Sequence, residues 1–393
     1  MKEGDVIKIM LVNFYHVINS QGGAERVLCN MANELICRGY DVSICIAENE
    51  NGLPFFALDS SVNFINVGIG LSRDLSFTEK IKRSMFFCRK DRHTFTENLV
   101  DMRLVSRVSP VVKSVNPDVI ISFSADASRV LYKSVGVYYP VITMCHSTPE
   151  IYLSNCSHDT IKAVEQYQCF QVLMPSFVKK AKKYINNKTI VCIPNAVNIY
   201  PKDNLIKEKL IVNVGRISRN EKRQHIAIEA FNMIHKDFPD WRMEFYGEIM
   251  EPDYFDYCNE LIRKYKLSDK VIYRGITNNI MNVLGISSVF CFPSAYEGFG
   301  LALAEAMSSG LACIGFKNSP GVNELIVDGS NGILCDDGID NFAKGLHELL
   351  SYKDKRDTYG AQARVDMQKY SPKRVWDEWD VLINDIATKH MMK

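Results

Sequence analysis

Short runs of buried-type residues alternate with helix-type segments along the whole chain, and this alternation restricts the fold more than any other feature. A helical spacing of apolar residues fills Gly23–Arg38, between the first two runs. Val- and Ile-rich strands separated by helices predict a parallel sheet that is covered on both faces. The runs of the first half are Ile7–Val12, Val42–Ala47, Val62–Val67, Val119–Phe123, Val141–Cys145, Val172–Met174 and Ile190–Ile193.

The same pattern restarts near residue 209, after a segment rich in Pro and Asn over 194–208 that we interpret as a linker. A helix is expected at His225–His235. The later runs are Leu210–Val214, Met243–Tyr246, Val271–Tyr273, Val289–Phe292 and Ala312–Phe316. The sequence therefore predicts two doubly wound α/β domains, over residues 1–195 and 205–372. Ligands of such sheets bind at the carboxyl ends of the strands, so we expect a cleft between the domains.

The last segment, 373–393, is predicted to be a helix that packs through Trp376 and Trp379. The 47 basic and 46 acidic residues give a net charge of +1, which supplies no global field for binding nucleic acid. Twelve cysteines without a Cys-x-x-Cys pair indicate free thiols in a reducing cytosol. No apolar run approaches the ~20 residues that span a bilayer, and no secretory signal is evident. We therefore expect a cytoplasmic protein.

The first motif, Gln21–Arg26, follows the first predicted strand and opens a helix. Gly22 and Gly23 allow close approach of the backbone to a ligand, and the helix N-terminus behind them attracts a phosphate or a sugar hydroxyl. A tight turn explains the glycine pair equally well. The motif is not the Gly-x-Gly-x-x-Gly fingerprint, which argues against a nicotinamide enzyme.

The second motif, Val214–Gln224, follows the first strand of the second domain. Arg216 and Lys222 flank a short loop in which both cations can converge on one anion. A departing nucleoside diphosphate needs its developing negative charge neutralised, and fixed Arg and Lys donors do this without a metal. The alternative is a solvated basic loop. No Asp-x-Asp motif occurs in the chain, so we expect no metal ion and no cofactor.

The third motif, Pro293–Ala306, follows the strand Val289–Phe292. Gly298 and Gly300 form a loop that can wrap a polar ligand, and a helix over Leu301–Met307 points its N-terminus at that loop. Glu297 precedes this helix and Glu305 lies within it. A Glu in an apolar run needs a polar partner, which favours a ligand-binding role for Glu305 over an exposed position.

His146 ends the strand Val141–Cys145, which is a ligand-facing position in this architecture. The alternative is a buried, hydrogen-bonded histidine that has no contact with a ligand.

These motifs together resemble glycosyltransferase family 4, the group 1 family, which has the GT-B fold. Glu297 and Glu305 match its Glu-x7-Glu signature, and Pro194–Val197 resembles its linker with Ala196 in place of Gly. The resemblance implies retaining transfer from a nucleotide sugar and a terminal helix that crosses back to the first domain. It assigns diphosphate binding to Arg216 and Lys222. The donor-binding residues it implies are Gly22, Gly23, Arg216, Lys222, Glu297, Gly298, Phe299, Gly300, Leu301 and Glu305.

In this resemblance the catalytic residues are Glu297, His146, Arg216 and Lys222. Glu297 contacts the donor sugar, Glu305 binds the ribose, and His146 faces the transferred sugar. The version of the glycine loop in this chain favours a UDP-sugar, with a hexose or N-acetylhexosamine as the transferred group. Two alternatives remain, a nucleotide-sugar 2-epimerase of similar fold and a non-catalytic nucleotide-binding relative.

A basic amphipathic segment spans residues 75–93 and indicates an acceptor presented at a membrane. Its cations and aromatics are Lys80, Lys82, Arg83, Phe86, Phe87, Arg89 and Lys90. Similar bacterial enzymes extend glycans on polyprenyl diphosphate through such a helix, which predicts a lipid-linked saccharide acceptor in bacterial surface glycan synthesis. The protein would then sit at the inner face of the plasma membrane. The alternative is a core-packed helix with a solvated charged face.

Overall fold

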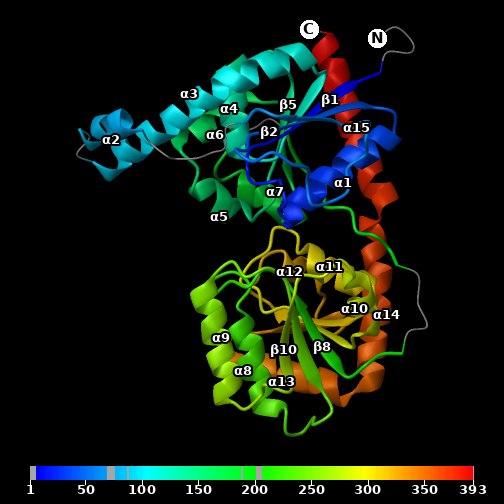
Figure 1. Ribbon diagram of the computed structural model, residues 1–393. Helices are drawn as coiled ribbons and strands as arrows, with labels where there is room; N and C mark the ends of the chain where they lie inside the picture. The colour runs from blue at the N-terminus through cyan, green and yellow to red at the C-terminus, as the bar shows by residue number, and fades with distance from the viewer. Residues whose placement is uncertain (1–5, 69–75, 86–87, 187–188, 201–205, 393) are drawn as a thin grey trace. The chain divides into compact units, whose positions relative to one another are not determined.

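The computed structural model describes residues 6–68, 76–85, 88–186, 189–200 and 206–392. The chain forms two compact units, Met1–Ile193 with Glu378–Lys393, and Pro194–Asp377. Each unit contains a parallel sheet flanked by helices, as Figure 1 shows, so the predicted α/β class with two doubly wound sheets is confirmed.

The first unit has the strand order β3-β2-β1-β4-β5-β6-β7. Its strands are β1 (Lys8–Asn13), β2 (Asp41–Ile46), β3 (Asn63–Asn66), β4 (Val119–Ser122), β5 (Val141–Met144), β6 (Cys169–Val172) and β7 (Ile190–Cys192). Its helices are α1 (Gly23–Cys37), α2 (Phe77–Ser84), α3 (Arg89–Val115), α4 (Ala125–Val135), α5 (Pro149–Ser154), α6 (His158–Gln166) and α7 (Pro175–Ala181). Strand β1 pairs with β2 and β4, so the loops that follow these three strands gather at one edge of the sheet.

The second unit has the strand order β10-β9-β8-β11-β12-β13, which is the order of a dinucleotide-binding sheet. Its strands are β8 (Leu210–Val214), β9 (Arg242–Tyr246), β10 (Val271–Gly275), β11 (Val289–Cys291), β12 (Ala312–Phe316) and β13 (Gly332–Cys335). Its helices are α8 (Gln224–Ile234), α9 (Pro252–Lys264), α10 (Ile280–Ile286), α11 (Leu301–Ser308), α12 (Val322–Leu325), α13 (Ile339–Ser351), α14 (Lys353–Met367) and the 3-10 turn η1 (Gln368–Tyr370).

The terminal helix α15 (Pro372–Met391) begins in the second unit, and its residues from Glu378 onward belong to the first. Asp380 fixes it there, because its carboxylate accepts hydrogen bonds from Arg38 Nη1 at 3.1 Å and from Tyr40 Oη at 2.7 Å. Both tryptophans, Trp376 and Trp379, are buried, as expected for a packing helix.

The sequence misplaced one strand. The run Val172–Met174 was expected to form it, whereas β6 is Cys169–Val172. Met174 is instead the N-cap residue of α7, and Pro175 occupies the first helical turn, a position that suits proline. Gln171 is a polar residue that interrupts the apolar pattern of this strand. It can be buried because its side-chain amide donates to the carbonyl oxygens of Val172 and Ile193.

Candidate functional site

The candidate donor site lies in the second unit, where the loops after β8, β11 and β12 meet. These strands are neighbours in a parallel sheet, so their carboxyl ends share one edge. The loop after β8 carries Arg216 and Lys222, and the loop after β11 carries Glu297 and the two glycines. The backbone links these loops, because Ala295 N donates to Glu221 O at 2.8 Å.

Lys222 and Glu297 form a buried ion pair at the centre of this edge. Lys222 Nζ lies 2.7 Å from Glu297 Oε1 and 3.0 Å from Glu221 Oε1. Burial opposes the charge on Lys222, but the two carboxylates outweigh it, so the pKa of the Lys222 ammonium is raised above its ordinary value. Lys222 is therefore a fixed, fully charged cation, 75 residues in sequence from its partner.

Arg216 shares a carboxylate with Lys222. Its Nη2 lies 3.7 Å from Glu221 Oε2, and 48% of its side chain is exposed. The structure thus brings the two predicted cations to one acidic side chain, with Lys222 held and Arg216 free to reach toward a ligand. An anion that replaces these carboxylates meets two preplaced positive charges.

The glycine loop gives Glu297 its position. Gly300 adopts a φ of 79° and begins α11 as its N-cap residue, a conformation that favours glycine. Behind it, Glu297 N donates to Pro320 O at 2.9 Å. A Cβ on Gly321, whose φ is 80°, would lie 2.5 Å from the carbonyl oxygen of Glu297. The chain at 319–321, after β12, is therefore packed directly against the backbone of Glu297, whose side chain is the predicted catalytic carboxylate.

The remaining predicted donor residues occupy different environments. Phe299 is buried, and its ring packs edge-on against Tyr370 with centroids 5.2 Å apart, so its side chain belongs to the core. Gly298, Leu301 and Glu305 are half-buried on this loop and on α11. The hydroxyls of Ser294 and Ser319, in the loops after β11 and β12, are buried without a partner among the described residues.

The predicted residues of the first unit lie at the carboxyl edge of its sheet. Gly22 is the N-cap residue of α1 and Gly23 its first residue. A Cβ on Gly22 would lie 2.0 Å from a carboxylate oxygen of Glu25, so the glycine lets Glu25 fold back over the helix start.

His146 follows β5, and its ring stacks on Phe123 with centroids 5.1 Å apart. Burial lowers the pKa of His146 to about 4, so the imidazole is neutral at pH 7. Its Nε2 is buried and, among the described residues, has no hydrogen-bond partner. The alternative considered for this histidine was a buried, hydrogen-bonded side chain. The described residues supply no such hydrogen bond at Nε2.

Sequence reasoning missed Glu48, which fixes the loop between β1 and α1. Glu48 Oε1 accepts from the backbone N–H groups of Val17 at 2.6 Å and Ile18 at 2.9 Å. Its Oε2 lies 2.6 Å from His16 Nδ1. The sequence feature that could have identified Glu48 is its position directly after a buried strand, since such positions lie at the ligand-facing edge of the sheet.

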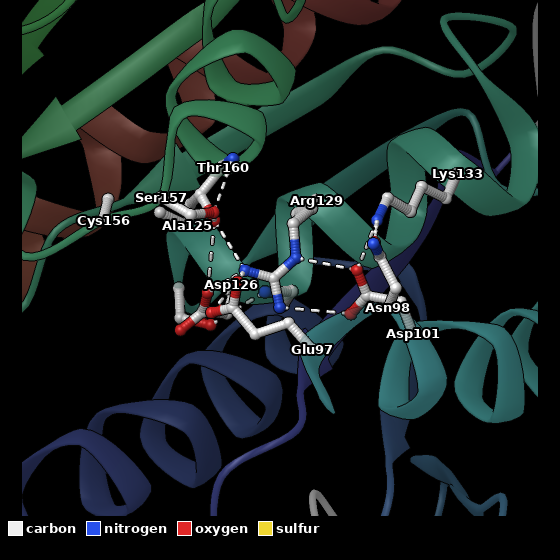
Figure 2. Close-up of polar contacts among 12 residues, drawn as sticks. Glu97, Asn98, Asp101, Ala125, Asp126, Arg129, Lys133, Cys156, Ser157 and Thr160 are labelled. Carbon is white, nitrogen blue, oxygen red and sulfur yellow. Dashed lines mark hydrogen bonds and ion pairs between the residues drawn. The ribbon is translucent and has the colours of Figure 1, made fainter. Parts of the chain in front are cut away.

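Sequence reasoning also missed a buried charge cluster built on Arg129 of α4, shown in Figure 2. Arg129 Nε donates to Asp101 Oδ2 at 2.9 Å, and Nη1 donates to Asp126 Oδ1 at 2.7 Å and to Thr160 Oγ1 at 2.6 Å. Lys133 Nζ adds a second cation 2.7 Å from Asp101. The cluster joins α3, α4 and α6, and it reaches the β1–α1 loop because Tyr15 Oη donates to Asp126 Oδ2 at 2.7 Å.

The predicted membrane-binding residues divide into two groups. Lys80, Lys82 and Arg83 lie on α2 and are exposed. Phe86 and Phe87 lie outside the described residues, and Arg89 and Lys90 form the start of α3. No helix within the described ranges is long and apolar enough to span a bilayer. Over the same ranges, no three His, Cys, Asp or Glu side chains gather in a group that could hold a metal ion.

Comparisons with known proteins identify the class of protein to which the chain is similar. The model of the protein family described as glycosyl transferases group 1 matches residues 198–366. An uncharacterized glycosyltransferase of Haemophilus influenzae is 26% identical over 376 residues, covering 92% of this chain and 96% of its own. The GalNAc-alpha-(1->4)-GalNAc-alpha-(1->3)-diNAcBac-PP-undecaprenol alpha-1,4-N-acetyl-D-galactosaminyltransferase of Campylobacter jejuni is 24% identical over 392 residues, covering 96% and 99%.

Among solved structures, a mutant of TarM from S. aureus in complex with Fondaparinux, alpha-GlcNAc-glycerol and UDP matches with a TM-score of 0.75. That match covers 96% of this chain and 100% of the TarM chain at 15% identity. The protein is therefore a glycosyltransferase of the GT-B fold. Its second unit carries a group 1 glycosyltransferase domain.

Proposed function

We propose that the protein transfers a hexose or N-acetylhexosamine from a UDP-sugar to a lipid-linked saccharide, with retention of configuration and without a metal ion or cofactor. The observation that carries the proposal is the shared carboxylate of Glu221, which gathers Arg216 and Lys222 beside Glu297. Two cations at one point, at the carboxyl edge of a dinucleotide-type sheet, suit the diphosphate of a nucleotide sugar.

The leaving UDP gains negative charge as the bond to the sugar breaks. Lys222 is already charged and positioned, so it stabilises that charge with little reorganisation. Arg216, which is half exposed, closes on the diphosphate from the solvent side. Glu297 stands next to Lys222 and is the carboxylate that would contact the donor sugar, while Glu305 on α11 would bind the ribose. In transfer with retention of configuration, the acceptor can attack on the face of the sugar from which UDP leaves. This reaction needs no base from the protein if a phosphate oxygen of the leaving UDP takes the acceptor proton.

The donor and acceptor classes are supported by two relatives. The TarM structure is a complex with UDP, and the name of the Campylobacter jejuni relative describes an N-acetylgalactosaminyltransferase acting on an undecaprenol-linked glycan. A donor of this kind brings two phosphates to Arg216 and Lys222 and a ribose to Glu305.

A thermal-shift screen of UDP-, GDP- and ADP-sugars in EDTA tests the donor. A ligand that binds only the folded chain raises the melting temperature, and we expect the UDP-sugars to give the largest rise. The same screen on Lys222→Ala should lose the rise, whereas Lys209→Ala, an exposed cation paired with Asp240, should keep it. A shift that appears only when divalent metal replaces EDTA would reject transfer without a metal ion. A shift that appears only with GDP- or ADP-sugars would reject a UDP-sugar as the donor.

The membrane part of the proposal depends on α2. Ser76 and Glu79 form a capping box at its start, and Arg103 Nη2 donates to both carboxylate oxygens of Glu79 at 2.8 and 2.7 Å, which fastens the helix to α3. Phe77, Ile81 and Met85 are exposed and, spaced four residues apart, share one face. None of the residues of α2 is buried, which favours a surface role over the core-packed alternative for this helix.

Flotation with vesicles of phosphatidylglycerol and phosphatidylcholine tests this surface. Each cation near an anionic membrane contributes about 1 kcal/mol, so replacing Lys80, Lys82 and Arg83 by Gln should abolish flotation. The matched control replaces the exposed cations Lys236, Arg263 and Lys264 of the second unit by Gln and should float like the wild type. Equal flotation of the two triple variants would remove the membrane role of α2.

A further inference from the structure

Arg223 has a backbone conformation that is uncommon for its residue type. It is the N-cap residue of α8, and its φ of 51° lies in the left-handed region, where a residue with a side chain is strained. Its N–H donates to Ser218 O at 3.0 Å, which closes the loop after β8 on itself. Strain of this kind persists only where the surrounding structure holds it, and it is concentrated at functional sites. The residue before Arg223 is Lys222, the fixed cation of the donor site.

The side chain of Arg223 reaches across three further strands of the sheet. Its Nε donates to the carbonyl oxygen of Pro293, after β11, at 2.9 Å. Its Cζ lies 4.8 Å from the centroid of the Phe316 ring, at the end of β12, which is a cation–π distance. Its Nη1 donates to Asp337, after β13, at 3.2 Å to Oδ1 and 3.4 Å to Oδ2. Since β8, β11, β12 and β13 are adjacent in the sheet, one guanidinium connects four consecutive strand ends.

This clamp, formed by Arg223 with Pro293 and Asp337, joins the two loops that carry the ion pair of the donor site. Lys222 lies in the loop after β8, and Glu297 lies further along the loop that begins at Pro293. The clamp uses neither member of that ion pair, so it can hold the loops together when a ligand replaces a carboxylate. The side chain of Arg223 is 16% exposed and that of Asp337 is 45% exposed. The arginine is therefore anchored inside, and the aspartate closes the clamp at the surface.

We infer that Arg223 is a positioning residue, whose clamp keeps Lys222 and Glu297 in place while a nucleoside diphosphate exchanges with the carboxylates around Lys222. The inference rests on the proposed donor and adds a residue that prepares its site. A cation that is already ordered binds phosphate more tightly than one that must be ordered during binding. The clamp should therefore matter for the diphosphate and not for the nucleoside.

Isothermal titration of the full chain with UDP and with UMP tests the clamp. UMP lacks the second phosphate, so the ratio of the two affinities reports on the cations that bind the diphosphate. Arg223→Gly keeps the left-handed backbone without strain but removes the clamp. It should weaken UDP binding about tenfold, as expected when a charged hydrogen bond is lost, and should leave UMP binding unchanged.

Asp337→Asn removes only the surface end of the clamp. It should weaken UDP binding by a smaller factor, about threefold, because the pair is partly exposed. Combined with Arg223→Gly it should add no further loss, since the two changes break one contact. If Arg223→Gly does not fold, Asp337→Asn decides alone, by lowering the affinity for UDP but not for UMP.

Two controls match these changes outside the clamp. Lys266→Gly also replaces a cation in the left-handed region, with a φ of 57°, at an exposed position after α9. Asp336→Asn neutralises the neighbouring exposed carboxylate, which lies 3.6 Å from Lys317 Nζ. Both controls should bind UDP and UMP like the wild type.

The inference is overturned if Arg223→Gly keeps the wild-type ratio of the UDP and UMP affinities, as Lys266→Gly should. It is also overturned if Arg223→Gly weakens both nucleotides equally, because a general loss of structure would do the same. A wild type that binds UDP no better than UMP would reject the diphosphate site, and with it both the proposed donor and the clamp. A wild type that prefers UDP, with an unchanged ratio in Arg223→Gly, would reject the clamp alone.

Discussion

The two units each contain a cluster of buried opposite charges, and the clusters differ in whether they are closed. In the first unit, Arg129 uses Nε and both terminal nitrogens on Asp101, Asp126 and Thr160, and packs three helices together. In the second unit, Lys222 meets two carboxylates, while its neighbour Arg216 stays half exposed and nearby serine hydroxyls stay unpartnered among the described residues.

This difference distinguishes a cluster that stabilises the fold from one that can bind a ligand. A buried ion pair whose donors are all satisfied holds elements in register, and removing one member leaves an uncompensated charge. An ion pair that has unused hydrogen-bond donors and solvent-exposed side chains can exchange a carboxylate of the protein for an anionic ligand. The Arg129 cluster is therefore expected to control stability, whereas the Lys222 cluster is expected to control catalysis.

The largest effect should come from breaking the closed cluster. Asp101→Ala leaves Arg129 and Lys133 without their buried carboxylate and should lower the free energy of unfolding by about 3–5 kcal/mol. Urea titration followed by circular dichroism measures this. The control, Asp385→Ala, breaks an exposed pair with Lys389 on α15 and should cost less than about 1 kcal/mol. A similar small loss for both variants would show that the Arg129 cluster is not structural.

Breaking the open cluster should affect turnover. Lys222→Ala should lower the rate of sugar transfer by about 10²–10³-fold, as when one preorganised donor to a developing anion is lost, and should weaken UDP binding. Glu297→Gln keeps an acceptor for Lys222 but removes a negative charge beside the diphosphate site. It should therefore lower transfer while leaving UDP affinity equal or higher. Isothermal titration with UDP separates the two variants, and a parallel loss of UDP affinity in both would contradict the opposed roles.

A third variant sharpens the comparison without changing a charge. In Gly321→Ala the new Cβ would lie 2.5 Å from the backbone carbonyl oxygen of Glu297. Either the Glu297 backbone, and with it the side chain, or the chain at 319–321 must then move. Gly329 has a similar φ of 73°, but a Cβ there meets nothing within 4 Å. Gly329→Ala should therefore cost only the backbone strain, about 1–2 kcal/mol, with normal transfer. Gly321→Ala should cost more and should reduce transfer, and equal activities would show that 319–321 does not position Glu297.

Local patterns in the sequence predicted the sheets well. The runs Leu210–Val214 and Ala312–Phe316 coincide with β8 and β12, because a buried parallel strand must be apolar on both faces. Strand β13 was not predicted, since Gly332–Cys335 is short and begins with a glycine. The motifs also predicted which loops carry Arg216, Lys222 and Glu297, because those loops follow buried strands.

The contacts that position these residues were not predictable from one sequence. Glu48 holds a loop 30 residues away, and Glu297 rests on the glycine that begins α12. Such contacts depend on which strand ends are neighbours, and strand order is a property of the whole sheet. The Arg129 cluster was missed for the same reason, since its carboxylates lie on α3 and on the first turn of α4 and appear in the sequence as ordinary helix-surface charges.

The smallest effect should come from a residue that carries no charge at pH 7. Burial lowers the pKa of His146 from 6.5 to about 4, so the unfolded chain binds a proton more readily than the folded one. Stability is therefore complete above pH 6.5 and is lost as the pH falls toward 4. Between pH 7 and pH 6 the loss should be less than about 1 kcal/mol. Urea titrations at these two pH values should show a smaller loss of the free energy of unfolding for His146→Gln than for the wild type. His158→Gln, which replaces an exposed histidine at the start of α6, should behave like the wild type. An unchanged loss in His146→Gln would mean that folding does not lower the pKa of this imidazole.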